Sequence, residues 1–380
     1  MLREAETKYG RIRGIASADP RITVFRGVPF AAPPTGENRW RAPRPYQPWE
    51  GVLDAARFAP ISVQDVPGLG TDVYCREWHV DPEIPMDEDC LYLNIWTPAK
   101  KPDEKLPVLV WFFGGALQWG YTAEMEFDGE AYARRGVILV TINYRCGIFG
   151  FLAHPWLKQE SEKGLCGNYG TLDQIAALAW VRENISAFGG DPEKVTVAGQ
   201  SAGAKMASAL LCTHKAKGLF SAVMMDSGAT SAIRDIHTAQ EIAERFASAY
   251  GLTQENAREK LLEAPWEELM EHQGVLFAGP SLQNLGPVFD GINFEGEDAL
   301  EIIRSGKANY VTMLGGYNRD EYSSLMAYYP MKSVDDLVGF FGRNTPYIMT
   351  VLEKYHIEGD MDRLVAIVSR YFYGFPCIDM

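Results

Sequence analysis

Apolar residues come in short runs along the chain, separated by longer segments in which apolar positions recur with helical spacing. Residues 106–113 and 137–144 are apolar on both faces, which predicts strands in the centre of a covered sheet. Residues 195–197 begin a third such strand. Residues 173–188 carry apolar positions at helical spacing and precede a Gly-Gly-Asp-Pro stop. Strands that alternate with helices predict an α/β protein with a mostly parallel, doubly wound central sheet, covered by helices on both faces.

The flanking patterns add further elements to this sheet. Short runs between residues 7 and 30 predict antiparallel edge strands. Residues 220–225 and 310–314 predict two more strands after the third run, and residues 238–272 and 332–372 have a mostly helical pattern. No internal repeat is present, which argues against a solenoid.

Composition and charge exclude several classes of partner. The chain has 380 residues, 47% of them hydrophobic, which is enough for a large core. Its net charge of −14 opposes binding to nucleic acid or to an anionic membrane, because both require a basic surface. The most apolar run is too short for a membrane span. The charged N-terminus has no apolar leader segment, which predicts a cytoplasmic protein unless a leader has been removed.

The six cysteines, at positions 75, 90, 146, 166, 212 and 377, lack the spacing of a metal site. We expect buried or incidental thiols, and we expect neither a metal nor a cofactor.

The residues after the third run are typical of a catalytic nucleophile. Gly199-Gln200-Ser201-Ala202-Gly203 follows the strand and leads into helix-forming residues. A serine at the tip of a sharp strand-to-helix turn has a raised hydroxyl, and flanking glycines avoid collisions between strand and helix. The pattern therefore predicts that Ser201 is a nucleophile; the alternative is an ordinary turn serine.

Other small or polar residues also come just after predicted strands. Ligands of doubly wound sheets bind beyond the carboxyl ends of the strands, so we expect these residues to lie near Ser201 at one edge of the sheet. They are Gly114, Gly115, Ser227, Asp320 and Glu321.

Four further motifs occur in order along the chain. They are Phe-Arg-Gly-Val-Pro-Phe-Ala at residues 25–31, Glu-Asp-Cys-Leu-Tyr-Leu-Asn-Ile-Trp at 88–96, Gly-Asn-Tyr-Gly at 167–170, and Phe-Gly-Gly-Asp-Pro at 188–192. With the serine motif they resemble the carboxylesterase and cholinesterase family (type B carboxylesterases) of the α/β-hydrolase fold. The resemblance implies a serine hydrolase that cleaves small-molecule carboxylic esters, with a Ser, Glu or Asp, His triad in that chain order.

The resemblance also implies a domain organisation. We expect a single α/β-hydrolase domain over residues 1–380, with helical cap insertions at 232–280 and 332–372.

The resemblance assigns the backbone N–H groups of Ala202, Gly114 and Gly115 to an oxyanion hole. Attack on an ester carbonyl places negative charge on its oxygen, and each fixed amide donor stabilises that charge by about 3 kcal/mol. The alternative for the two glycines is a plain turn that ends the strand. Leu117 and Trp119 are expected to line the acyl pocket, although they also fit a role in the core.

The oxyanion loop departs from the family at one position. Phe113 stands where the family has a histidine. Because a backbone donor does not need that side chain, we expect a shifted loop or an altered substrate preference rather than loss of the hole.

The resemblance makes Glu321 the acid of the triad, with Asp320 as its rival and a solvated loop charge as the alternative for both. A carboxylate here would orient the histidine and stabilise its cationic form. Ser227 is expected to hydrogen-bond this carboxylate, or else to be a buried serine at a strand end.

The base of the triad is missing from its expected place. Only His356 follows Glu321, in a charged, helical stretch, and we expect it to be a solvated helix residue rather than a catalytic one. The remaining histidines are His79, His154, His214, His237 and His272. We expect a truncated, fragmentary or degenerate family member with little activity, and the alternative function is that of a non-catalytic, cholinesterase-like binding protein.

Three structural pairs follow from the resemblance. Arg39 with Glu88 and Arg145 with Asp173 are expected ion pairs, which are important only if buried. Cys75 and Cys90 match the family's first disulfide, but a reducing cytosol would keep them as thiols.

Overall fold

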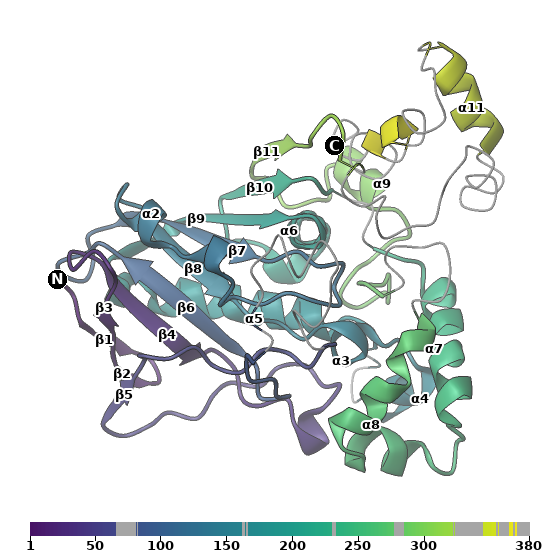
Figure 1. Cartoon of the computed structure of the whole chain (residues 1–380), viewed down its shortest axis with the longest axis horizontal. Coiled ribbons are helices and arrows are strands. Elements are labelled where there is room, and N and C mark those ends of the chain that lie inside the picture. Colours follow the sequence, from purple (N-terminus) through teal and green to yellow (C-terminus); the bar gives the residue numbers. More distant parts are fainter. Residues whose placement is uncertain are drawn as a thin grey trace.

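A computed structural model describes residues 1–65, 81, 83–161, 164, 166–229, 233–276, 285–321, 323, 345–354, 356, 365–367 and 369–370. Its centre is an eight-stranded sheet with the order β11-β10-β9-β7-β8-β6-β4-β3 (Figure 1). The five strands from β11 to β8 run parallel, and the remaining three pair antiparallel. The predicted mostly parallel sheet is therefore confirmed. In chain order the strands are β3 (Ile15–Ala16), β4 (Thr23–Pro29), β6 (Tyr92–Thr97), β7 (Leu106–Phe112), β8 (Ile138–Ile142), β9 (Gly190–Gln200), β10 (Ala222–Asp226) and β11 (Thr312–Gly316).

A second, three-stranded sheet holds part of the N-terminal segment. It pairs β2 (Gly10–Arg13) with β1 (Glu4–Thr7) and β5 (Val52–Asp54). The strands expected between residues 7 and 30 therefore belong to two sheets. β2 is in the smaller sheet because it pairs with β5, which follows it by about forty residues, whereas β3 and β4 are in the larger sheet.

Helices cover both faces of the large sheet. Val108 and Val110 of β7 share one core with α5 (Tyr169–Asn184) and α6 (Ala202–Ala209). Leu109, between the two valines, packs on the opposite side in a cluster that includes α2 (Glu130–Ala133). Successive strand residues point to opposite faces, so an uninterrupted apolar strand is what a doubly covered sheet requires.

The remaining helices lie beyond the sheet. Figure 1 shows α4 (Pro155–Glu160), α7 (Ile236–Tyr250) and α8 (Trp266–Glu271) grouped together, and α11 (Thr345–Lys354) at a distance from the strands. The other helices are α3 (Gly147–Phe151), α9 (Ala299–Arg304), a π-helical turn (Glu259–Glu263) and short 3₁₀ turns at Gly36–Asn38, Met125–Phe127, Ile185–Phe188, Leu210–Cys212, His214–Ala216 and Gln273–Leu276.

The helical pattern over residues 238–272 is interrupted. Gly251 ends α7 in the left-handed region, with φ of 66°, and Pro265 precedes α8. Most of the second predicted helical segment, 332–372, lies outside the described residues, and the cap assignment of both segments stays a prediction. Of the helices that the structure describes, none combines the length and the apolar character that a bilayer span demands.

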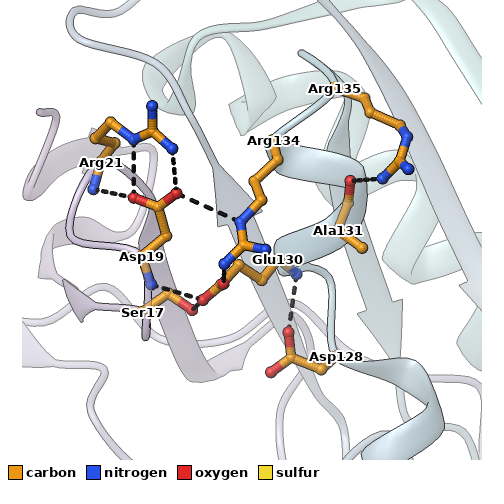
Figure 2. A network of polar contacts seen from close by, with 8 residues as sticks. All are labelled: Ser17, Asp19, Arg21, Asp128, Glu130, Ala131, Arg134 and Arg135. Atoms are coloured by element: carbon orange, nitrogen blue, oxygen red, sulfur yellow. Dashed lines mark hydrogen bonds and ion pairs between the residues drawn. The ribbon is translucent and has the colours of Figure 1, made fainter.

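A polar network fastens the turn between β3 and β4 to α2 (Figure 2). The carboxylate of Asp19 accepts hydrogen bonds from the Nε (3.0 Å) and Nη2 (2.7 Å) of Arg21, and it lies 3.4 Å from the Nε of Arg134. The carboxylate of Glu130 accepts from the Ser17 hydroxyl (2.6 Å) and from the Asp19 amide (2.9 Å). The hydrogen bond from Arg21 lowers the pKa of Asp19. The edge of the sheet is thereby tied to the helix on its face.

Both expected ion pairs are present and buried. Arg39 donates to Glu88 through its Nε (2.6 Å) and Nη2 (2.5 Å). Arg145 donates to Asp173 through its Nε (2.8 Å) and Nη2 (2.7 Å), and both side chains are at most 3% exposed. Arg39 also donates to the carbonyl oxygens of Leu261 (2.7 Å) and Ala264 (2.8 Å), so it links the proline-rich segment, residues 33–48, to the π-helical turn.

Candidate active site

Ser201 occupies a sharp turn between β9 and α6. Its φ of 54° and ψ of −119° are unusual for a residue with a side chain, so the turn stores backbone strain. Its amide donates to the carbonyl of Asp226 on the adjacent strand (2.8 Å), and its carbonyl accepts from the backbone amide of Lys205, one helical turn later (3.0 Å). Ser201 therefore stands at the carboxyl edge of the sheet and outside any regular element.

The glycines around Ser201 allow three backbone segments to meet. A methyl group at Gly203 would collide with the carbonyl oxygen of Phe112, at the end of β7. A methyl group at Gly199 would lie 2.5 Å from the carbonyl carbon of Gly203. One at Gly114 would lie 3.3 Å from the Cβ of Ser201 and 2.7 Å from the Gln200 side chain. The loop after β7 and the serine turn are thus in direct contact.

The loop after β7 is tightly constrained. Gly115, Ala116 and Leu117 all have positive φ, at 101°, 54° and 64°. The amide of Gly147 donates to the Leu117 carbonyl (2.7 Å), and Gln64 binds the amide (2.9 Å) and carbonyl (3.1 Å) of Gly120 at the other end of the loop. Two strained non-glycine residues held in this way indicate a functional turn.

Phe113 belongs to the core. It is 1% exposed, its ring stacks on that of Tyr144 with 4.3 Å between centroids, and the Tyr144 hydroxyl donates to its carbonyl (2.8 Å). The aromatic side chain therefore anchors the first residue of the loop by packing. Whether its presence alters substrate preference stays a prediction.

The two residues expected to line a pocket differ in exposure. Leu117 has no exposed surface and packs in the main core, whereas Trp119 is 37% exposed. The pocket role of both stays a prediction.

Three backbone N–H groups of the serine turn and of the loop that contacts it have no protein acceptor among the described residues. Gly114, Gly115 and Ala202 donate to no described residue, and Ala202 is the first residue of α6, where an N–H has no partner within the helix. Unsatisfied donors at a helix N-terminus favour an anion.

Glu321 is held beside the end of β10. The Ser227 hydroxyl donates to its Oε1, and the Asn318 amide donates to the same oxygen (2.7 Å). Asp320 instead forms an exposed ion pair with its neighbour Arg319 (2.8 Å). The predicted hydrogen bond between Ser227 and Glu321 is therefore present, and the geometry favours Glu321 over Asp320.

The register of the strands brings the start of the loop that carries Glu321 to the level of Ser201. Asp226 pairs with Gln200 on one side and with Gly316 on the other, so β9, β10 and β11 end at the same level. Neighbouring strands are about 4.8 Å apart, so the loop after β11 begins about two strand spacings from Ser201.

Each of the five described histidines is either exposed or in contact with residues outside the candidate site. His154 caps α4 by accepting from the Trp156 amide (3.3 Å), and burial lowers its pKa. His214 lies 3.7 Å from Glu295, and the His272 ring lies 4.8 Å from that of Tyr250. The other two, His237 and His356, are exposed.

No described histidine hydrogen-bonds to Ser201 or to Glu321, and His79 lies outside the described residues. His356 follows the end of α11 and is exposed, which agrees with its expected solvated setting.

The next residues to consider are the described cysteines and the side chains that could bind a metal ion. Cys90 is a buried free thiol whose pKa is raised by burial, and its expected partner Cys75 lies outside the described residues. Within the described ranges, no group of three or more His, Cys, Asp or Glu side chains is placed to hold a metal ion.

Sequence reasoning missed a lysine near the serine and an arginine whose charge acts on that lysine. Lys205 lies one turn after Ser201 in an otherwise small and apolar helix, and Arg234 lies just before α7. A lysine within Ala-Gly-Ala-Lys-Met-Ala-Ser-Ala was the available signal, because buried helix positions rarely carry a charge.

Comparison with known proteins gives a consistent picture. Residues 2–361 match the model of the carboxylesterase family. The chain is 37% identical over 332 residues to a fumonisin B1 esterase of Sphingopyxis macrogoltabida, a match that covers 86% of this chain and 58% of that protein. It is 38% identical over 322 residues to a para-nitrobenzyl esterase of Bacillus subtilis (strain 168), covering 83% and 62%. The chain thus spans about three fifths of these relatives' length.

Solved structures share the fold. A carboxylesterase of Geobacillus stearothermophilus superposes with a TM-score of 0.86 at 35% identity, covering 99% of this chain and 76% of that one. A PNB esterase superposes with a TM-score of 0.82 at 30% identity, covering 100% and 77%. The expected α/β-hydrolase fold is therefore confirmed, and the chain belongs to the carboxylesterase family.

Proposed function

We propose that the protein is a serine hydrolase that cleaves carboxylic esters through an acyl-enzyme on Ser201. One observation carries this proposal: Ser201 sits on a strained turn in direct contact with Gly114, and the amides of Gly114, Gly115 and Ala202 have no acceptor among the described residues. A hydroxyl beside fixed, unused N–H donors is the arrangement that acyl transfer requires.

In the proposed reaction, the Ser201 oxygen attacks the ester carbonyl while a base takes its proton. The three amides stabilise the resulting oxyanion, each by about 3 kcal/mol. The intermediate then expels the alcohol, which receives the proton, and leaves an acyl group on Ser201. Water releases the acid in the reverse sequence of proton transfers.

Glu321 is proposed to orient the base. Its Oε1 is already bound by Ser227 and Asn318, which fixes the carboxylate and leaves its second oxygen for an imidazole N–H. None of the five histidines that the structure describes contacts Glu321. The test must therefore report the reaction of Ser201 with either an internal base or an added one.

The relatives favour an enzyme over a non-catalytic binding protein. The two curated relatives described above both carry the name of an esterase. The serine turn and the amide donors are also retained in full, and a purely adhesive surface has no need of either.

The test is hydrolysis of 4-nitrophenyl butyrate by the 380-residue chain, with and without added imidazole as an external base. We expect release of 4-nitrophenol, stimulation by imidazole if the internal base is weak, and loss of both in Ser201→Ala. The matched control is Ser221→Ala, which removes a serine hydroxyl that binds only the Val195 carbonyl. All rates are taken above the hydrolysis caused by imidazole alone, which cleaves 4-nitrophenyl esters without a protein. Hydrolysis above that background that survives in Ser201→Ala, or none above it under either condition, would overturn the proposal.

A further inference from the structure

The first turn of α3 is bound by groups from distant parts of the chain. Gly147 and Ile148 are its first two residues, and N–H groups at this position have no acceptor within a helix. The Gly147 amide donates to the Leu117 carbonyl (2.7 Å), in the strained loop after β7. The Ile148 amide donates to the side-chain Oε1 of Gln273 (3.1 Å). Two adjacent amides therefore connect the loop beside Ser201 to a glutamine that follows α8.

Gln273 is buried and fixed by packing. It opens the 3₁₀ turn Gln273–Leu276, and it is only 2% exposed. Leu269 in α8 and Leu276 at the end of the same turn are fully buried in the main core. A methyl group at Gly147 would lie 2.3 Å from the Gln273 Oε1, so the glutamine oxygen lies against the backbone of α3 as closely as a glycine allows.

Two segments from the N-terminal part of the chain bind the same turn. The Ser62 hydroxyl accepts from the Cys146 amide (3.0 Å), and the Trp40 indole N–H donates to the Ile148 carbonyl (2.8 Å). Gln273 belongs to the predicted cap segment, 232–280. Its hydrogen bond therefore adds that segment to a turn that the N-terminal part of the chain already binds.

The loop after β7 depends on such external contacts. Ala116 and Leu117 have positive φ although neither is a glycine, and such conformations persist only where the surrounding structure fixes them. Gly114 and Gly115, whose amides we assign to the oxyanion hole, directly precede them. The hydrogen bond that Leu117 accepts from α3 is therefore a support for the position of both donors.

Loss of the Gln273 oxygen would disturb this support. The Ile148 N–H would then be a buried donor without its acceptor, which is costly. The Leu117 carbonyl, already bound by the adjacent Gly147 amide, is an acceptor that this N–H can compete for. The expected result is a rearranged turn and a loop that is less well fixed.

We propose that Gln273 is a positioning residue for the oxyanion hole. Through the first two residues of α3 it fixes the loop after β7, and with it the amides of Gly114 and Gly115. The proposal rests on the proposed esterase function for its catalytic meaning, but the effect of Gln273 on the loop can be measured without turnover.

The first test is hydrogen–deuterium exchange of the intact 380-residue chain, followed by mass spectrometry. In Gln273→Met, which keeps the length of the side chain but removes its acceptor, we expect the peptide that covers residues 113–121 to exchange about tenfold faster. Gln273→Glu retains an acceptor oxygen, and because a carboxylate accepts well from an amide, this variant should exchange like the wild type. Near-ultraviolet circular dichroism checks that each variant is folded.

The matched control is Asn184→Leu. It also removes a buried side-chain oxygen, one that accepts from the Lys8 amide (2.9 Å) near the end of α5. We expect the exchange of peptide 113–121 to be unchanged in this variant, because Asn184 contacts neither α3 nor the loop through a described hydrogen bond.

The second test compares ester hydrolysis with the binding of two ketones, with imidazole present. The Ser201 oxygen can add to the carbonyl carbon of 1,1,1-trifluorohexan-2-one while its proton passes to the base, which leaves an oxyanion like that of ester hydrolysis. Hexan-2-one resembles it in shape but adds a serine oxygen poorly. In Gln273→Met we expect kcat/KM for 4-nitrophenyl butyrate and the affinity for the trifluoroketone to fall together, by about tenfold, with the affinity for hexan-2-one unchanged.

The outcomes separate this proposal from the esterase proposal. Faster loop exchange with parallel losses of rate and trifluoroketone affinity, all restored in Gln273→Glu, would support the positioning role. Unchanged loop exchange in Gln273→Met, an equal change in Asn184→Leu, or a fall in rate without a fall in trifluoroketone affinity would overturn it. If the wild type neither hydrolyses the ester nor binds the trifluoroketone, the esterase proposal fails, and the exchange measurement alone decides whether Gln273 fixes the loop.

Discussion

Arginines in two regions of this molecule, each with buried side-chain nitrogen atoms, differ in what neutralises them. Under the proline-rich segment, Arg39 and Arg145 each donate two hydrogen bonds to a carboxylate, Glu88 and Asp173. At the carboxyl edge of the sheet, Arg234 has a buried Nε and no such partner in the described ranges. Arg145 also keeps one buried nitrogen, Nη1, without a hydrogen-bond partner, so what separates the two regions is the carboxylate beside Arg39 and Arg145 rather than complete hydrogen bonding.

The difference indicates how to separate structural from functional charges in this fold. In a buried ion pair the two charges neutralise each other. Removing one partner leaves the other charge buried and unpaired, which lowers the free energy of unfolding. A cation without a carboxylate beside it among the described residues, such as Arg234, or one whose pKa is lowered by burial, such as Lys205, reduces stability, so removing it should raise stability. Four changes test this contrast.

The largest expected effect is in the compensated region. Asp173→Asn removes the charge that neutralises Arg145, and we expect a loss of about 3–5 kcal/mol in the free energy of unfolding, measured by urea denaturation. The matched control is Glu193→Gln, which breaks the exposed pair with Arg182 and should cost less than about 1 kcal/mol. Equal losses in the two variants would contradict the importance of burial.

Lys205→Met should stabilise the protein in a pH-dependent way. The pKa of Lys205 is lowered from 10.5 to about 8. Below pH 8 the lysine is charged in both states, and because the charged form is less favourable in the folded protein, it lowers the free energy of unfolding. We expect a gain of about 2 kcal/mol at pH 7 that shrinks as the pH rises from 8 towards 10.5. A gain that is constant from pH 7 to pH 10 would show that titration of Lys205 is not its cause.

Arg234→Met should leave stability unchanged or raise it by about 1 kcal/mol, because no ion pair is lost. The matched comparison is Arg145→Met, which leaves Asp173 buried without its cation and should destabilise the protein. Chemical denaturation of both variants at pH 7 decides the sign. A similar loss in both would mean that Arg234 is a structural cation after all.

The smallest effect is expected for the exposed arginine Arg21 in the network of Figure 2. Arg21→Gln removes the two side-chain hydrogen bonds to Asp19, but the amide of residue 21 still donates to that carboxylate, the Arg21 side chain is 79% exposed, and Arg134 lies near the same carboxylate. We expect the urea midpoint to stay at the wild-type value. A clear drop would show that this turn contributes more than its exposure implies.

The central strands and the serine turn could be predicted from the sequence, because their causes are local. Two-sided apolar runs specified β7 and β8, and Gly199 and Gly203 are required wherever a strand, a serine and a helix meet at short distance. The hydrogen bond from Ser227 to Glu321 was also expected, since both residues follow strands that end at one edge.

Other features depend on contacts between distant segments and were not predictable. Pairing of β2 with β5 moved part of the N-terminal segment into a second sheet. The effect of Arg234 on Lys205 was missed because the lysine in α6 and the arginine before α7 are far apart in the sequence. The apolar β11 is exposed at all five positions, which its sequence did not indicate.

The most direct test of the account is to map where a fluorophosphonate attaches to the 380-residue chain, by tandem mass spectrometry, with imidazole present as a base. The account predicts a single adduct on Ser201, and none in Ser201→Ala under the same conditions. An intact chain that stays unlabelled at Ser201, or an adduct on another serine that persists in Ser201→Ala, would contradict it.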